Sequence, residues 1–257
     1  MKTKTIVLIH GMFMTPLCWE NWIPYYEAKG YKALAPAWPG RDKTVEELRK
    51  AHPDSELAKL KLNHIVDHME TFIKSLDEKP AIIGHSMGGL VVQLLLQRDI
   101  VVAGVAIDPA PPAGVFTTEF SFLKANFPAI NPFLLSQPVQ MSFEHFQYAF
   151  VNTLPMDEQR AAYDRYVVPE SRGVPTSSLG AAGKVDFQRP RRPLLITAGE
   201  QDHIIPSSLN KTNYQKYKGT YVTDFKEFAG RDHFLIRSRG WEEIADYALD
   251  WLNKKVE

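Results

Sequence analysis

The chain has a single cysteine, no long apolar run and no excess of charge of either sign. Because Cys18 is alone, an internal disulfide and a zinc or iron–sulfur site built from cysteines are excluded. No segment approaches the roughly 20 apolar residues that a membrane-spanning helix needs. Near the start only residues 6–9 are continuously apolar, which is too few for the core of a secretory signal. We therefore expect a cytoplasmic protein that is not associated with a membrane.

The charge balance also limits the class of partner. Thirty Lys and Arg residues are matched by thirty Asp and Glu residues among the 257, so no broad basic surface is expected to attract nucleic acid. Hydrophobic residues make up 44% of the chain, enough for the core of one globular domain, with or without an insertion. The composition favours a small-molecule partner and gives no indication of the oligomeric state.

Buried strands alternate with helices in the first and last parts of the chain. Short apolar runs predict strands at residues 6–9, 31–40, 81–85, 101–108, 194–199 and 222–230. Apolar residues spaced about 3.6 apart predict helices between them, including one over residues 57–76. Such alternation is typical of an α/β fold, in which a mainly parallel sheet carries helices on both faces.

The alternation stops between Pro109 and about Arg192. This region is rich in proline and phenylalanine and shows short helical segments with no convincing strand. We interpret residues 113–192 as a helical cap, inserted after the fourth strand into a core of residues 1–112 and 193–257. A cap above the edge of a sheet creates the kind of apolar pocket that small ligands occupy.

A serine lies between the third strand and the helix that follows it. Residues 84–88 read Gly-His-Ser-Met-Gly and match the pattern G-x-S-x-G in its expected context, a strand-to-helix turn. The turn is sharp, so Gly84 and Gly88 must lack side chains. The helix that follows directs its N–H groups toward Ser86 and favours negative charge there. This pattern predicts that Ser86 is a nucleophile.

A serine hydroxyl needs a base and a third group that orients the base. Asp202 follows the fifth predicted strand, His233 follows the sixth, and the order Ser86, Asp202, His233 suits this architecture. Asp108, at the end of the fourth strand, is the next candidate for the acid. Neighbouring Asp232 is poorly placed to orient His233.

The oxyanion that forms during acyl transfer needs hydrogen-bond donors. We expect them to be the backbone N–H groups of Met87, which follows the nucleophile, and of Met12, in the loop after the first strand. The residues expected to line the substrate pocket are Phe13, Met14, Leu17 and Phe234. An apolar acyl or alcohol group on the substrate follows from this set.

One alternative site is a metal centre on the helix over residues 57–76. His64 and His68 lie four residues apart and share one face, but HIVDH has no glutamate after the first histidine and no third ligand is evident. Solvent-exposed helix surface is the better interpretation. We expect neither a metal nor a cofactor.

These residues resemble the α/β-hydrolase superfamily over both ends and the middle of the chain, with the cap unmatched. The resemblance implies about six parallel strands, and Ser86 disfavours the branches with an aspartate nucleophile. The start IVLIHGMFMTPLCWENW is similar to the plant methylesterase and hydroxynitrile lyase branch. The lyases have a threonine after the first-strand histidine and a lysine after the catalytic histidine, where this chain has Gly11 and Phe234.

Hydrolysis is therefore favoured over cyanohydrin cleavage. The expected activity is that of a serine hydrolase, which cleaves a carboxylic ester, lactone or thioester through an acyl-enzyme on Ser86. Two alternatives stay open at this point. One is a lyase that uses the same three residues, and the other is a non-catalytic receptor that uses the pocket only for binding.

Overall fold

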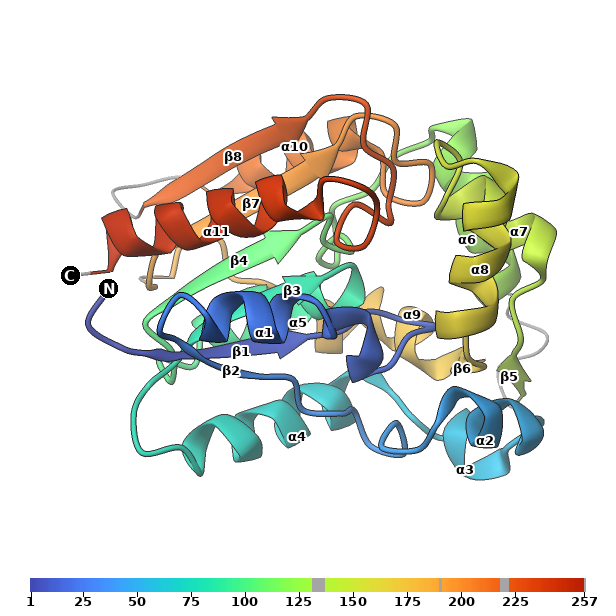
Figure 1. Cartoon of the computed structure of the whole chain (residues 1–257), viewed down its shortest axis with the longest axis horizontal. Helices are drawn as coiled ribbons and strands as arrows, with labels where there is room; N and C mark the ends of the chain where they lie inside the picture. Colours follow the sequence, from blue (N-terminus) through green and yellow to red (C-terminus); the bar gives the residue numbers. More distant parts are fainter. Residues whose placement is uncertain (131–136, 190, 218–221, 257) are drawn as a thin grey trace.

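The computed structural model describes residues 1–130, 137–189, 191–217 and 222–256. At its centre lies a six-stranded parallel sheet with the strand order β2-β1-β3-β4-β7-β8 (Figure 1). The strands are β1 (Thr5–Ile9), β2 (Lys32–Leu34), β3 (Ala81–His85), β4 (Ala103–Ile107), β7 (Leu194–Gly199) and β8 (Thr223–Phe228). β1, β3, β4 and β7 are buried at every residue, as expected for parallel strands that helices cover on both faces.

Helices cover both faces of this sheet (Figure 1). α1 (Trp22–Glu27) and α11 (Trp241–Lys255) lie on one face, while α5 (Met87–Leu96) and α10 (Ser207–Lys216) lie on the other. α4 (Leu62–Lys74) packs against α5, and the buried residues of this helix are Leu62, Ile65, Val66, Met69 and Ile73. The shorter helical segments before α5 are η1 (Pro16–Trp19), α2 (Val45–Lys50) and α3 (Ser55–Ala58).

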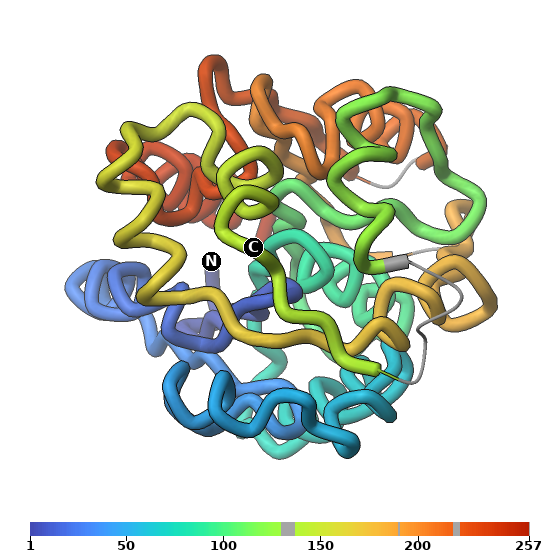
Figure 2. The backbone as a smooth tube through the Cα atoms, turned by 90° about the vertical axis from the view of Figure 1, so that its right-hand side faces the viewer, coloured from blue at the N-terminus to red at the C-terminus, as the bar shows by residue number. Residues whose placement is uncertain are grey.

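A helical insertion follows β4 and covers the end of the sheet toward which the strands point. Figure 2 shows its segments facing the viewer across that end. In chain order they are α6 (Phe120–Ile130), β5 (Pro138–Val139), α7 (Phe143–Ala149), α8 (Met156–Tyr166), β6 (Glu170–Ser171), α9 (Gly173–Ser178) and η3 (Ala181–Gly183). Residues 131–136 and 190 of the predicted cap lie outside the described residues. We use "the cap" for the described part of residues 113–192.

Three local features differ from the expectations raised by the sequence. The helix over residues 57–76 is divided into α3 and α4, because the intervening backbone bonds to the cap instead: the Ser171 hydroxyl donates to the Leu60 carbonyl, and the Leu62 N–H donates to Ser177 Oγ. β2 ends at Leu34, shortly before two prolines that cannot donate to a strand ladder.

The cap also contains one strand pair, where none was expected. β5 and β6 pair in antiparallel fashion over two residues each. Such short strands leave no alternating pattern in the sequence. None of the described helices combines the length and the apolarity that crossing a membrane requires.

Candidate active site

Ser86 occupies the sharp turn between β3 and α5. Its backbone angles are φ +57° and ψ −121°, a region that residues other than glycine rarely adopt and that is associated with functional sites. Hydrogen bonds hold the turn: the Ser86 N–H donates to the Ile107 carbonyl at 2.9 Å, and the Ser86 carbonyl accepts from the N–H groups of Gly89 and Ala110. The hydroxyl therefore projects from a rigid backbone into the pocket beneath the cap.

The two glycines of the motif are required for steric reasons. A Cβ atom on Gly84 would lie 2.2 Å from the Gly88 carbonyl oxygen, and one on Gly88 would lie 2.3 Å from that of Ile9. Both distances are far below van der Waals contact. The turn can be this tight, and this close to β1, only without side chains at these positions.

His233 and Asp202 meet at the same edge of the sheet. Nδ1 of His233 lies 2.6 Å from Oδ2 of Asp202, and both side chains are buried. Oδ1 of Asp202 accepts from the N–H groups of Ile204 and Ile205 at 2.8 and 2.9 Å, which fixes the carboxylate. When Nδ1–H donates to Asp202, Nε2 of His233 is left as the basic nitrogen.

Asp108 is a second buried carboxyl group beside the same histidine. Its Oδ2 lies 4.0 Å from Nδ1 of His233, and its Oδ1 accepts from the Gly199 N–H at 2.8 Å. Asp232, in contrast, uses Oδ2 to accept from the backbone N–H and hydroxyl of Thr153. Asp202 and Asp108 thus lie beside the His233 ring, whereas the Asp232 carboxylate binds Thr153.

Burial influences the protonation states of Asp108, Asp202 and His233. It raises the pKa of both Asp108 and Asp202, but the two backbone N–H groups stabilise charge on Asp202, and the Asp202 charge raises the pKa of Asp108 further. We therefore assign the ionised carboxylate to Asp202 and the protonated form to Asp108. Burial also lowers the pKa of His233, which favours the neutral imidazole that a general base needs.

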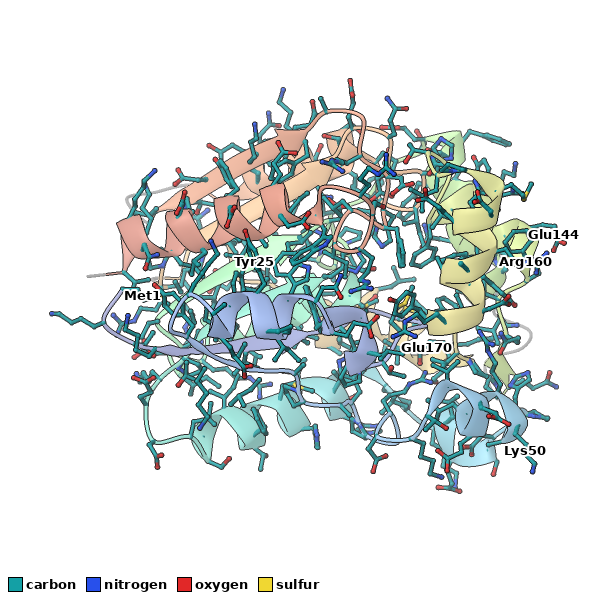
Figure 3. The ribbon with its side chains drawn as sticks, viewed as in Figure 1. Met1, Tyr25, Lys50, Glu144, Arg160 and Glu170 are labelled. Carbon is teal, nitrogen blue, oxygen red and sulfur yellow. The ribbon has the colours of Figure 1, made fainter. Side chains whose placement is uncertain are left out.

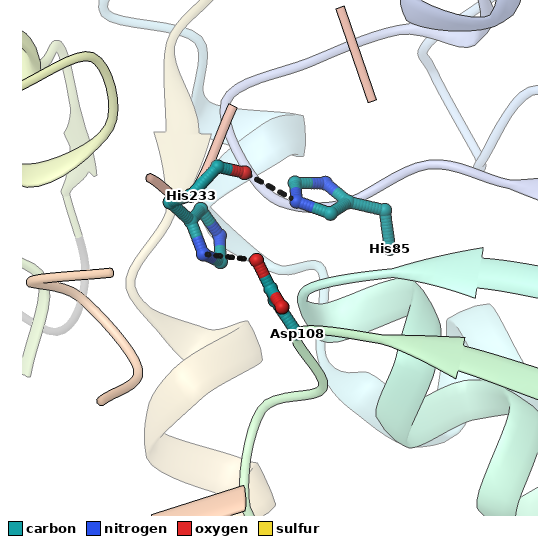
Figure 4. Close-up of side chains that lie close together, drawn as sticks. All are labelled: His85, Asp108 and His233. Atoms are coloured by element: carbon teal, nitrogen blue, oxygen red, sulfur yellow. Dashed lines mark hydrogen bonds and ion pairs between the residues drawn. The ribbon is translucent and has the colours of Figure 1, made fainter. Parts of the chain in front are cut away.

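His85, the residue before Ser86, contacts His233. Nε2 of His85 lies 2.8 Å from the His233 carbonyl oxygen, where it donates, and the two rings are 4.6 Å apart (Figure 4). Nε2 of His233 has no hydrogen-bond partner among the described residues, so the bond to Ser86 Oγ is not formed here. Catalytic hydrogen bonds commonly tighten only when substrate is bound.

The loop after β1 lies directly against the serine. A Cβ atom on Gly11 would lie 2.8 Å from the Ser86 Cβ atom and 3.0 Å from the His85 carbonyl oxygen. No backbone carbonyl in the described chain accepts the Met12 N–H, and the Met87 N–H, at the first position of α5, has no acceptor within its helix. Two N–H groups beside Ser86 are thus free to bind an oxyanion.

A cavity of about 280 Å³ opens above Ser86. Phe13, Met12 and Met87 line it, as do cap residues from α6 to α9 and the loop after β7; among these are Phe122, Ala125, Val139, Met141, Phe150, Pro175, Ile204 and Ile205. None of the described lining residues is Asp, Glu, Lys or Arg. The lining favours an uncharged, largely apolar ligand.

Three residues expected in the pocket lie elsewhere. Phe234 packs its ring against Phe146 and Tyr166, Leu17 lines a separate surface recess, and Met14 is buried in the core. The sequence predicted an apolar pocket beneath the cap but did not identify which cap residues form its wall. Their apolar character is equally compatible with a cap core, and only the folding of the cap determines which of them face Ser86.

His85, Asp108 and His233 are the described residues that could gather around a metal ion, with candidate ligand atoms within 4.8 Å of one another (Figure 4). Each already has a hydrogen-bond partner: the His233 carbonyl for His85, Gly199 for Asp108 and Asp202 for His233. The arrangement suits a hydrogen-bonded acid–base group. His64 and His68 each use a ring nitrogen for a backbone contact, with Lys61 and Ala37.

Comparison with known proteins places these features in context. Residues 6–247 match a model of the alpha/beta hydrolase family. A pyrethroid hydrolase of Sphingobium wenxiniae is 22% identical over 261 residues, which cover 96% of this chain and 89% of that protein. Among solved structures, a pyrethroid hydrolase has a TM-score of 0.72 at 18% identity with full coverage of both chains. Polyneuridine aldehyde esterase has a TM-score of 0.69 at 18% identity, covering 97% of this chain and 99% of its own.

Proposed function

The chain belongs to the alpha/beta hydrolase family, and we propose that within it the protein is a serine hydrolase that cleaves a carboxylic ester, lactone or thioester with an apolar acyl or alcohol group. The observation that carries the proposal is the 2.6 Å contact of His233 with Asp202 beside the strained Ser86 turn. Two similar proteins, a pyrethroid hydrolase and an esterase, support it.

The reaction proceeds in two half-reactions. Nε2 of His233 takes the Ser86 proton while Ser86 Oγ attacks the substrate carbonyl carbon, and Asp202 stabilises the imidazolium. The Met12 and Met87 N–H groups stabilise the negative carbonyl oxygen. His233 then gives its proton to the leaving alcohol or thiol. Water, deprotonated by His233, attacks the acyl-enzyme, and the acid leaves as Ser86 regains its proton.

The pocket supports an uncharged substrate. Its volume of about 280 Å³ and the absence of Asp, Glu, Lys and Arg among its described lining suit an apolar group on either side of the ester bond. His145, which also lines the pocket, has its pKa lowered by burial and is therefore neutral at pH 7. A charged group on the substrate would lose its hydration there without gaining a partner.

Substitution of the nucleophile tests the proposal. The Ser86→Ala protein is assayed with p-nitrophenyl acetate and p-nitrophenyl butyrate, and we expect its turnover to fall by about 10³-fold or more, because loss of a triad member leaves only oxyanion stabilisation and binding. Ser238→Ala is the matched control, since Ser238 is a buried serine whose hydroxyl donates to the Phe234 carbonyl and which does not line the pocket.

A covalent label identifies the reacting atom. Intact-mass and peptide analysis after treatment with a fluorophosphonate should find one adduct, on Ser86, and none in Ser86→Ala. Wild-type turnover by a folded Ser86→Ala protein would contradict the proposal. So would tight binding of esters without any turnover by the wild-type protein, which is the behaviour of a receptor.

A further inference from the structure

The cap holds the backbone of Phe13, the residue after the proposed oxyanion donor Met12, from both sides. The Phe13 N–H donates to Oε2 of Glu170 at 3.2 Å, and the Phe13 carbonyl accepts from the Val168 N–H at 2.9 Å. Phe13 has a φ of +62°, in the left-handed region that a phenylalanine rarely adopts. Phe13 belongs to the loop between β1 and η1, residues 10–15, which we call the oxyanion loop. Contacts with the cap therefore hold a strained residue of the oxyanion loop in place.

Glu170 is itself held on the inner side of the cap. It lies in β6, is completely buried, and is labelled in Figure 3, where it lies between α8 and the core. Its Oε1 accepts from the Ser171 N–H at 2.7 Å and lies 2.7 Å from Nη2 of Arg41, which is also buried. The carboxylate thus joins the Phe13 backbone to a buried cation.

Arg41 comes from a third segment, the loop after β2. The backbone N–H of Arg41 donates to the Trp38 carbonyl at 2.9 Å, and the backbone N–H of Trp38 donates in turn to Nε2 of His10 at 3.3 Å. The rings of His10 and Trp38 stack 4.4 Å apart, and Nδ1 of His10 lies 2.9 Å from the Gly11 carbonyl oxygen. The cap, the loop after β2 and the oxyanion loop are therefore connected by one buried polar network.

A contribution to the stability of the fold does not by itself explain why Arg41 and Glu170 form a buried ion pair. A buried ion pair is weak evidence for stabilisation, because the desolvation of two charges opposes their attraction. None of the three guanidinium nitrogens of Arg41, moreover, has a hydrogen-bond partner in the described part of the chain, so the contact of Nη2 with Glu170 is an ion pair without hydrogen-bond geometry. An apolar pair of similar volume would avoid that cost. A role in holding the neighbouring Phe13 backbone in position explains the buried ion pair better.

The oxyanion loop has little freedom to move. Gly11 is packed so closely on Ser86 that not even a methyl group fits between them. The donors of an oxyanion hole must lie about 3 Å from the developing charge, and a displacement near 1 Å costs about two orders of magnitude in rate. A displacement of Phe13 is transmitted directly to Met12, its covalent neighbour.

We propose that Glu170 and Arg41 are positioning residues for ester cleavage. Their ion pair fixes the Phe13 N–H and through it the Met12 N–H that stabilises the oxyanion. The inference rests on the proposed function. It assigns to the cap a part in the chemical step as well as in the pocket wall, and neither charged side chain touches the substrate.

Two double variants that differ only in the acceptor for Phe13 test this role. Arg41→Met/Glu170→Gln removes both charges but keeps a side-chain oxygen for the Phe13 N–H, whereas Arg41→Met/Glu170→Met removes the acceptor at similar volume. We expect kcat for an ester that the wild-type protein cleaves to be about tenfold or more lower in the methionine variant than in the glutamine variant. KM should agree within about threefold, because oxyanion stabilisation acts on the transition state.

Ser171→Ala is the control for general cap packing. Ser171 is the buried neighbour of Glu170 in β6, and its hydroxyl binds the Leu60 carbonyl without touching Phe13. It should keep wild-type kcat and KM. Equal kcat in the two folded double variants would overturn the proposal, and so would an equal loss of kcat in Ser171→Ala.

Amide hydrogen exchange in the wild-type protein supplies a measurement that needs no variant. If Glu170 holds Phe13, the Phe13 N–H exchanges far more slowly than an exposed amide, as measured by NMR. Rapid exchange at Phe13 would overturn the proposal even if the methionine variant did not fold. A wild-type protein that cleaves no ester would count against the proposed function. The exchange result would still decide whether Glu170 holds the Phe13 N–H.

Discussion

Oδ2 of Asp108 lies 4.0 Å from Nδ1 of His233 and has no hydrogen-bond partner within the described residues. The same nitrogen donates to Asp202 at 2.6 Å. Two carboxyl groups, which follow β4 and β7, thus approach one imidazole, and only one of them can be ionised without a large electrostatic cost. Asp202 has the better support for charge, because two backbone N–H groups bind its other oxygen.

The two aspartates should therefore respond differently to amide substitution. Asp202→Asn removes the acceptor that fixes the tautomer of His233, and we expect kcat to fall by roughly 10²- to 10⁴-fold. Asp108→Asn replaces a neutral acid by a neutral amide and should change kcat by less than about fivefold. Steady-state kinetics of the two folded variants decides the assignment, and a larger loss in Asp108→Asn would transfer the role of triad acid to Asp108.

The acid limb of the pH–rate profile should lie below the range of an ordinary histidine. Catalysis needs neutral His233, so activity is present above its pKa and is lost as the pH falls through it. Burial lowers that pKa against the opposing charge of Asp202, whereas an imidazole of pKa near 6.5 would lose about tenfold in activity between pH 7.5 and 5.5. We expect kcat/KM to change by less than about twofold over this interval while the protein stays folded. A midpoint at or above pH 6.5 would contradict this assignment.

Gly11→Ala should damage both stability and activity. The new Cβ atom would meet the Ser86 Cβ atom at 2.8 Å, and overpacking of this kind costs about 1–3 kcal/mol. The loop must shift to relieve the contact, which moves Met12 away from the oxyanion. Thermal melting and the rate of fluorophosphonate labelling measure the two effects.

Gly180→Ala is the matched control for this substitution. A Cβ atom there would lie 3.8 Å from its nearest neighbour, an ordinary contact, and the φ of Gly180 is −107°. We expect wild-type melting and labelling. If Gly11→Ala labelled as fast as Gly180→Ala, the close approach of the loop to Ser86 would have no catalytic consequence.

The substrate preference can be tested with a matched pair of esters. p-Nitrophenyl butyrate and p-nitrophenyl hemisuccinate have acyl groups of similar length, but the second ends in a carboxylate. No Lys or Arg lines the described pocket, so we expect kcat/KM to be about tenfold or more lower for the charged ester. Similar values for both would mean that the acyl group remains in solvent during the reaction.

Several features followed from the sequence alone because their signals are local. The parallel sheet was readable from short apolar runs, and the Ser86 turn from glycines whose spacing is dictated by steric contact with Gly88 and Ile9. The order of Ser86, Asp202 and His233 predicted one shared sheet edge, and the structure brings Asp202 and His233 into contact there. The catalytic roles remain predictions for the experiments above.

Other features depend on contacts between segments distant in the sequence and left no local pattern. Phe234 and Met14 look like pocket residues beside their motifs, but each turns toward the core. The division of residues 57–76 into two helices reflects hydrogen bonds from the cap to Leu60 and Leu62.

The α/β class and the candidate nucleophile, base and acid could be inferred without coordinates, because periodic burial and tight-turn sterics act over a few neighbouring residues. Two other features became visible only in the folded chain: two carboxyl groups flank His233, and Glu170, 157 residues from Phe13, binds the backbone of the oxyanion loop. Burial and charge pairing are properties of the assembled fold, since they depend on which distant segments exclude water together.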